Sequence, residues 1–152
     1  MSVKKILVSG GFDPIHPGHI RMMAEAYAIY GHVVVVLNSD DWLIRKKGYF
    51  FFNYIWRREI LLGLRCVNEV TAVDDRDGTV CEALHRIRPD YFGNGGDRGP
   101  ANTPELEVCR KLGIEPIFNL GGGKLVSSSD SFNQAMAMLA SKAVKVPGAQ
   151  AV

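Results

Sequence analysis

The stretch G-G-F-D-P-I-H-P-G-H, residues 10–19, directly follows the apolar run Ile6, Leu7 and Val8. A short apolar run between lysines and glycines is typical of a strand buried in a parallel sheet, and Pro17 suits the first position of a helix. The stretch therefore predicts a strand, a glycine turn and a helix start. The first amides of a helix lack backbone acceptors and lie at the positive end of its dipole, which makes this turn a favourable phosphate site.

Two histidines, His16 and His19, lie three residues apart at the start of this predicted helix. If residues 17 and 18 open the helix, both imidazoles face the same side, where a pair that carries a proton favours phosphate. Two ordinary surface histidines remain the plain alternative. A metal site needs a third or fourth ligand, and no nearby Cys or His has metal-like spacing, so we predict no metal ligands.

Strand-like and helix-like segments alternate along the chain. Strands are predicted at 6–8, 33–37, 67–73, 90–92 and 115–120, and helices at 17–30, 56–65, 80–87, 103–112 and after 127–130. This alternation predicts an α/β fold of the Rossmann-like kind, an open parallel five-stranded sheet with helices on both faces. Ligands of such sheets bind at the carboxyl ends of the strands.

Polar clusters follow several of these strands. Lys46 and Lys47 lie in a predicted basic loop that could move onto phosphates, although a lysine pair on a loop is usually solvated surface. Arg57 is predicted to open a helix, where a cation is unfavourable to the dipole and a phosphate ligand would explain it. Three consecutive serines offer hydroxyls and helix-start amides to an anion, with simple N-capping as the alternative: Ser127, Ser128 and Ser129.

The chain of 152 residues has the length of one ordinary domain. We expect a domain over residues 1–144 and a flexible tail at 145–152. A formal net charge of only +2 predicts no nucleic-acid partner and favours a small molecule. The aromatic segment 49–56 is too apolar for a wholly exposed loop, so we expect it to be buried in a homodimer or to close over substrate.

Cellular location is indicated by the cysteines and by the apolar segments. The three widely spaced cysteines are typical of reduced core residues and predict a cytoplasmic protein: Cys66, Cys81 and Cys109. No apolar run reaches membrane-spanning length, and the first residues lack a signal-peptide pattern. We therefore expect neither a membrane partner nor a targeting segment.

The motif His16-Pro17-Gly18-His19 resembles the H-x-G-H signature of the cytidylyltransferase-like nucleotidyltransferase superfamily. The resemblance continues through the basic segment, Arg57 and the serine run. Segment 88–97, R-P-D-Y-F-G-N-G-G-D, is similar to the nucleotidyltransferase half of ADP-heptose synthase, and glycerol-3-phosphate cytidylyltransferase is similar through residue 73. Asn94 replaces a lysine of the heptose enzymes, and an arginine usual near the serine run has no match in residues 121–124, where Lys124 could substitute.

The resemblance implies attack by a substrate phosphate on the α-phosphorus of a nucleoside triphosphate, with release of pyrophosphate. His16 and His19 would be catalytic at the α-phosphate, and Lys46 or Lys47 would bridge the two substrates. Mg²⁺ would bridge the phosphates. The implied nucleotide-binding residues are Gly11, Phe12, Asp13, Gly18, Arg57, Gly95, Gly96, Asp97, Ser127, Ser128 and Ser129.

The resemblance implies three hypotheses. The leading one is a nucleotidyltransferase that uses ATP or CTP and a sugar phosphate similar to heptose 1-phosphate. The second is a cytidylyltransferase that acts on glycerol 3-phosphate or another small alcohol phosphate. The third is a nucleotide-binding regulatory module without turnover, against which the intact histidine pair argues, because binding alone would tolerate its loss.

Overall fold

A computed structural model of the protein describes residues 3–96, 98–123 and 127–145. The strands are β1 (Lys4–Gly10), β2 (Gly31–Leu37), β3 (Glu69–Thr71), β4 (Tyr91–Gly95) and β5 (Glu115–Leu120). The helices are α1 (Pro17–Tyr30), α2 (Asp40–Lys47), α3 (Tyr54–Leu62), α4 (Cys81–Ile87), α5 (Leu106–Leu112) and α6 (Ser128–Lys145), with a short 3-10 helix, η1, at Pro100–Asn102. The strands form one parallel sheet in the order β3-β2-β1-β4-β5, which confirms the predicted α/β fold.

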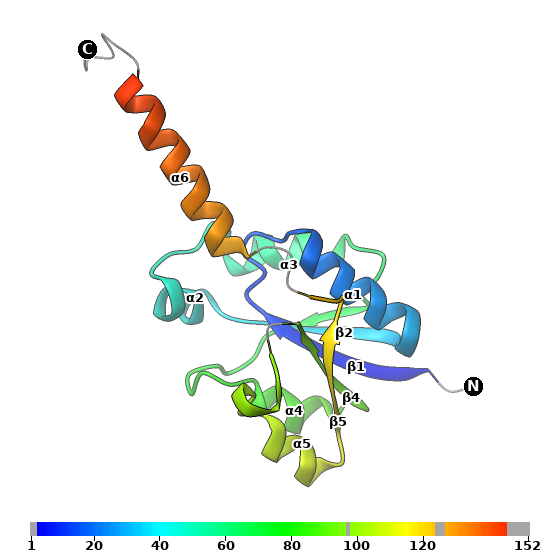
Figure 1. Ribbon diagram of the computed structural model, residues 1–152. Helices are drawn as coiled ribbons and strands as arrows, with labels where there is room; N and C mark the ends of the chain where they lie inside the picture. The colour runs from blue at the N-terminus through cyan, green and yellow to red at the C-terminus, as the bar shows by residue number, and fades with distance from the viewer. Residues whose placement is uncertain (1–2, 97, 124–126, 146–152) are drawn as a thin grey trace.

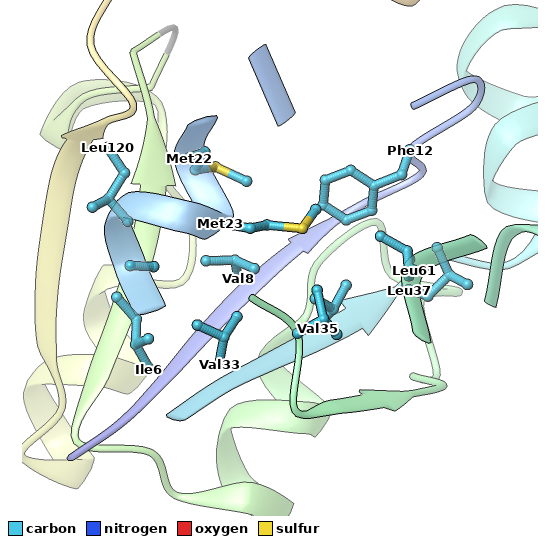
Figure 2. Packing of buried hydrophobic residues seen from close by; sticks show 12 residues of the cluster. Ile6, Val8, Phe12, Met22, Met23, Val33, Val35, Leu37, Leu61 and Leu120 are labelled. Carbon is cyan, nitrogen blue, oxygen red and sulfur yellow. The ribbon is translucent and has the colours of Figure 1, made fainter. Parts of the chain in front are cut away.

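The two faces of the sheet are buried under different helices (Figure 1). Ile6 and Val8 of β1 point to the face covered by α1 and α3, where they pack in one cluster with Met23 (Figure 2). Leu7, between them, packs on the other face with Leu84 of α4. Because side chains alternate along a strand, an uninterrupted apolar strand supplies both cores at once.

The strand order reverses at β1, and this reversal positions the site. β1 pairs with β2 along its whole length, but with β4 only at Ile6 and Leu7. Beyond Leu7 the pairing between the two strands ends, and their carboxyl ends line one cavity. Crevices at such a reversal of strand order are where open α/β sheets bind ligands.

The predicted basic loop was wrong, because Lys46 and Lys47 lie in the last turn of α2. Ser39 caps the helix by accepting the Trp42 N–H at 3.0 Å. Acidic residues in the first turn and basic residues in the last turn interact favourably with the helix dipole. These interactions stabilise α2 although the helix is short. Gly48, at a φ of 86°, ends the helix in the left-handed conformation.

Some element boundaries also differ from prediction. Helix α3 begins at Tyr54 with Asn53 as its N-cap, so Arg57 lies within the helix and the dipole argument for it does not hold. The third strand is shorter than predicted, and β4 extends to Gly95, beyond the predicted strand at 90–92. Helix α5 begins only at Leu106, because η1 precedes it.

Helix α6 extends away from the sheet and its covering helices (Figure 1). Phe132, in its first turns, packs against the rings of Tyr49 and Phe51, with centroids 4.5 and 5.0 Å away. Its residues 133–143 are exposed. Within the described residues no helix is long and apolar enough to cross a membrane. The predicted tail lies outside the described residues apart from Lys145, as does Lys124.

Candidate active site

A cavity of about 430 Å³ lies at the carboxyl ends of β1 and β4. It is lined by every predicted site residue except Arg57, which is buried elsewhere, and Asp97, which lies outside the described residues. Residues 10–13, the end of α2, the end of β4 and the serine run therefore line one cavity. Residues the sequence analysis did not single out also line the cavity, among them Trp42, Arg98 and Glu105.

His16 and His19 form reciprocal hydrogen bonds at the start of α1. His16 is the N-cap, and its Nδ1 accepts the N–H groups of Gly18 at 3.1 Å and His19 at 3.4 Å. In return the His16 N–H donates to Nδ1 of His19 at 3.2 Å, which completes a reciprocal capping box. The amides of Gly18 and His19 are thus already bonded within the protein, so these two amides are not the phosphate donors that the sequence suggested.

This hydrogen-bond pattern determines the tautomer of both rings. Because each Nδ1 accepts a hydrogen bond, the proton of each neutral imidazole lies on Nε2. Burial, followed by the charge of His16, lowers the pKa of His19 from 6.5 to about 3. The expectation of a proton-carrying pair is therefore wrong for His19, which is neutral near pH 7 and acts as a hydrogen-bond donor through Nε2.

Phe12 and Gly18 shape the space around the pair. The Phe12 ring is buried and meets the His19 ring edge to face, with centroids 4.9 Å apart. A Cβ at Gly18 would lie 2.9 Å from Cε1 of His16. Gly18 therefore allows the His16 ring to sit over the helix start, and Phe12 supports the His19 ring from the core side.

Asp13 lines the cavity, but its carboxylate bonds the protein rather than facing outward. Its oxygens accept the N–H groups of Phe51 and Phe52 at 2.7 and 2.8 Å, and the side chain is fully buried. Its backbone carbonyl accepts a hydrogen bond from Lys47 Nζ at 2.7 Å. Asp13 thus ties the aromatic segment and α2 to the glycine turn. Lys46 Nζ lies 4.6 Å from the centre of the Trp42 ring.

Arg57 is 1% exposed and lies outside the cavity lining. Its guanidinium donates to the backbone carbonyls of Phe52, Gly11 and Asn38 at 2.8 to 2.9 Å. It also forms a 2.6 Å ion pair with Asp40. With these partners Arg57 joins the glycine turn to β2, α2 and α3, so the structure supports a positioning role in place of the predicted phosphate contact.

The serine run lies at the start of α6. Ser127 Oγ accepts the Asp130 N–H at 3.0 Å, which is an N-cap contact, and Ser128 Oγ donates to the Pro14 carbonyl at 2.8 Å. The N-capping alternative therefore holds for Ser127. Since all three serines also line the cavity, the helix start remains at the site.

The glycine-containing segments after β4 and after β5 lie next to each other in the cavity lining. A Cβ at Gly96 would lie 2.5 Å from the Gly122 carbonyl oxygen, and one at Gly121 would lie 2.8 Å from the Met22 amide. Residues 121–123 were not predicted to belong to the site, although a glycine triplet directly after a strand was an available signal. The absence of side chains brings the backbone after β4, the backbone after β5 and helix α1 into contact.

Comparison with known families decides the assignment. The profile of the family described as Cytidylyltransferase-like matches residues 7–112, which include the second half of β1, the histidine pair, α2 and β4. The chain belongs to this family. It is a nucleotidyltransferase.

Two curated relatives illustrate its neighbourhood within the family. A protein named FAD synthase from Picrophilus torridus is 30% identical over 130 residues, which cover 83% of this chain and 91% of the relative. The Bifunctional protein HldE from Azorhizobium caulinodans is 29% identical over 129 residues, covering 83% of this chain but only 26% of the relative. The nucleotidyltransferase described here thus matches one relative almost entirely and the other over about a quarter of its length.

A solved structure shares the fold. The crystal structure of the lipopolysaccharide core biosynthesis protein from Thermoplasma volcanium superposes with a TM-score of 0.66 and 20% sequence identity. The match covers 78% of this chain and 97% of that one. At this identity the likeness shows the fold of the nucleotidyltransferase and nothing more.

Proposed function

We propose that this nucleotidyltransferase transfers a nucleotidyl group from ATP or CTP to a sugar phosphate of the heptose 1-phosphate type and releases pyrophosphate. The observation that carries the proposal is the stacked pair His16 and His19 in the cavity, with ring centroids 3.6 Å apart. Their Nε2–H groups suit a phosphate whose negative charge increases during reaction.

The reaction forms one P–O bond and breaks another. An oxygen of the acceptor phosphate attacks the α-phosphorus, and the bond to the bridging oxygen of pyrophosphate breaks. The protein needs no covalent intermediate, so it acts by holding the two phosphates in line and by neutralising charge. In the proposal His16 and His19 donate to the α-phosphate, and Lys46 or Lys47 bridges the triphosphate and the acceptor phosphate.

Magnesium is proposed to enter with the nucleotide. The described residues contain no group of three or more His, Cys, Asp or Glu that could hold a metal ion. The Asp13 carboxylate in the cavity is already bonded to two amides. The residues present therefore fit an ion held mainly by phosphate oxygens and water, a coordination that Mg²⁺ prefers, and the ion would neutralise charge on the triphosphate.

The choice of acceptor rests on sequence similarity. The relationship to HldE supports a sugar phosphate. The relationship to a FAD synthase over 91% of its length favours, as a second candidate, the flavin phosphate FMN, whose adenylylation yields FAD. Glycerol 3-phosphate remains the small alcohol phosphate to compare, and a regulatory module that binds nucleotide without turnover is the alternative outside catalysis.

A matrix of pyrophosphate-release assays tests the proposal. ATP and CTP would each be combined with heptose 1-phosphate, glycerol 3-phosphate and FMN in the presence of Mg²⁺. We expect pyrophosphate release with the heptose phosphate and one of the two nucleotides. Release with FMN alone would replace the acceptor, and nucleotide binding by calorimetry without release in any combination would favour the regulatory module.

We also propose that the enzyme forms a homodimer through α6 and the neighbouring aromatic segment. Phe132, Met136 and Leu139 lie on one face of α6, and the last two are 50% and 61% exposed. Phe51, which contacts Phe132, is also partly exposed. Because an isolated helix of this length is marginally stable in water, an apolar face that continues from an aromatic contact favours a second copy as its partner.

A further inference from the structure

Arg98 is a cation in the cavity that no local sequence pattern marks. It follows β4 and lines the same cavity as the histidine pair and Lys46. Its side chain is 39% exposed, so the guanidinium is accessible to a ligand. The question is whether the surrounding structure holds it in place as a binding group.

The backbone around Arg98 is fixed by local hydrogen bonds. The Arg98 N–H donates to the Gly95 carbonyl at 3.2 Å, and the Gly99 N–H donates to Asn102 Oδ1 at 2.8 Å. The buried Thr103 hydroxyl donates to the Gly99 carbonyl at 2.9 Å. The turn that carries Arg98 is thus bonded on both sides of the residue.

The side chain of Arg98 is paired with Glu105, which is 2% exposed. Glu105 Oε1 accepts the Val80 N–H at 3.1 Å, which ties the segment before α5 to the start of α4. Its Oε2 is buried without a hydrogen-bond partner in the described part of the chain, and Nη1 of Arg98 lies 3.5 Å from it. A buried carboxylate with an unbonded oxygen is costly unless a nearby charge compensates it, and Arg98 is that charge.

Other basic side chains near the cavity have partners within the protein. Arg57 is enclosed by carbonyls and Asp40, and Arg45 donates to the Asp75 carbonyl at 2.8 Å. Lys47 donates to the Asp13 carbonyl. Nη1 of Arg98 lies 3.5 Å from Oε2 of Glu105, and a guanidinium has five N–H donors in a planar fork that matches two phosphate oxygens.

We infer that Arg98 is a phosphate-binding residue of this cavity, held in position by the buried carboxylate of Glu105. The ligand is a phosphate group of one of the two substrates, either the acceptor phosphate or the triphosphate. The inference rests on the proposed function, because that function brings both phosphorylated substrates to the cavity. The binding measurements that test it do not require turnover. Glu105 is a positioning residue that acts through Arg98.

Five variants test the inference: Arg98→Ala, Arg98→Lys, Glu105→Gln, the double variant of Arg98→Ala with Glu105→Gln, and Arg110→Ala as a matched control. Arg110 is a 71% exposed arginine of α5 outside the cavity, paired with Glu107. Because a charge-assisted hydrogen bond contributes substantially to binding, we expect Arg98→Ala to weaken one phosphate ligand by about 10- to 100-fold. Arg98→Lys should retain part of the phosphate affinity, and the control Arg110→Ala should leave this affinity unchanged.

Two measurements distinguish the sources of the phosphate. Calorimetric titration with ATP, CTP and pyrophosphate measures their dissociation constants and so tests whether Arg98 binds the triphosphate. This measurement is possible even if none of the proposed acceptors is a substrate. In the pyrophosphate-release assay, the KM of the phosphorylated acceptor tests whether Arg98 binds the acceptor phosphate. A loss in either one supports the inference and names the source. Unchanged dissociation constants and unchanged KM in Arg98→Ala would overturn it, and failure of the acceptor matrix with intact nucleotide binding would overturn only the proposed acceptor.

The double variant tests the role of Glu105. Gln at position 105 retains an oxygen for the Val80 N–H but removes the charge beside Arg98. We expect Glu105→Gln to weaken phosphate binding in the wild-type background and to add nothing in the Arg98→Ala background. An equal effect in both backgrounds would show that Glu105 does not act through Arg98. Urea unfolding of each variant verifies that the fold is intact.

Discussion

The imidazole rings of His16 and His19 stack with their centroids 3.6 Å apart and their planes at 21°. Each ring nitrogen Nδ1 is bonded to a backbone amide of the other residue, so the stack is fixed by the start of α1. Two neutral rings can pack in this way, whereas two cations would repel each other. The pair thus presents Nε2–H donors from a rigid support, which is the preorganisation that charge-stabilising catalysis requires.

Asparagine variants separate the two functions of each histidine. His16→Asn and His19→Asn each retain an oxygen near the Nδ1 position that can accept the same amide, but they lack the Nε2–H donor. We expect each to lower kcat by about 10²- to 10³-fold with little change in unfolding free energy. Steady-state pyrophosphate release and urea unfolding measure the two quantities. Unchanged turnover in both variants would remove the pair from catalysis.

The low pKa of His19 predicts a specific pH dependence of stability. In the folded state its pKa is about 3, against 6.5 in the unfolded chain. Between these values the unfolded state binds the proton and the folded state does not, so stability falls as pH falls from 6.5 toward 3. The slope from this group is at most about 1.4 kcal/mol per pH unit.

Urea unfolding of the wild type and of His19→Asn from pH 7.5 to pH 4.5 measures this contribution. The wild type should lose stability relative to the variant as the pH is lowered, because only the wild type contains the titrating ring. Groups that do not contact His19 titrate in both proteins and cancel in the difference. Parallel curves for the two proteins would contradict a buried neutral His19.

Gly18→Ala should affect activity more than stability. The added Cβ would lie 2.9 Å from Cε1 of His16, so the ring must shift by a few tenths of an ångström. Since alanine favours a helix over glycine, we expect equal or higher stability but a kcat reduced about tenfold by the misplaced ring. Gly99→Ala is the control, because a Cβ there meets nothing within 4 Å. Equal kcat values for the two variants would rule out this packing effect.

Arg57→Leu should destabilise the protein. The substitution leaves the carbonyls of Gly11 and Asn38 without their buried donor and removes the partner of Asp40. Each buried carbonyl left without a donor costs about 1–3 kcal/mol, measurable as a lower unfolding free energy in urea. Had Arg57 bound the triphosphate directly, Arg57→Lys would raise the KM for nucleotide without destabilising the fold, and that outcome would restore the original prediction.

The proposed dimer can be tested by placing charge on α6. Leu139→Asp interrupts the apolar face of the helix, whereas Ser141→Asp lies on the side opposite Phe132. Sedimentation should show a dimer for the wild type and for Ser141→Asp, and a monomer for Leu139→Asp. A monomeric wild type would contradict the dimer.

Local patterns in the sequence were sufficient for the fold and the centre of the site. Alternating apolar segments predict a parallel α/β sheet, because burial on both faces imposes uninterrupted apolar strands. The motif at residues 16–19 places two histidines at a helix start through their spacing alone. The same local reasoning failed for α2, whose basic last turn, with Lys46 and Lys47, was interpreted as a loop.

Only the tertiary structure decided which charged groups are accessible. The sequence placed Arg57 and Asp13 at the ligand, yet the fold buries both in hydrogen bonds to segments 17 to 46 residues away. It also brings Arg98 and Glu105 into the cavity, although no local pattern marks them. The physical reason is that helix and strand periodicity depends on neighbours in sequence, whereas the burial and pairing of a charge depend on neighbours in space.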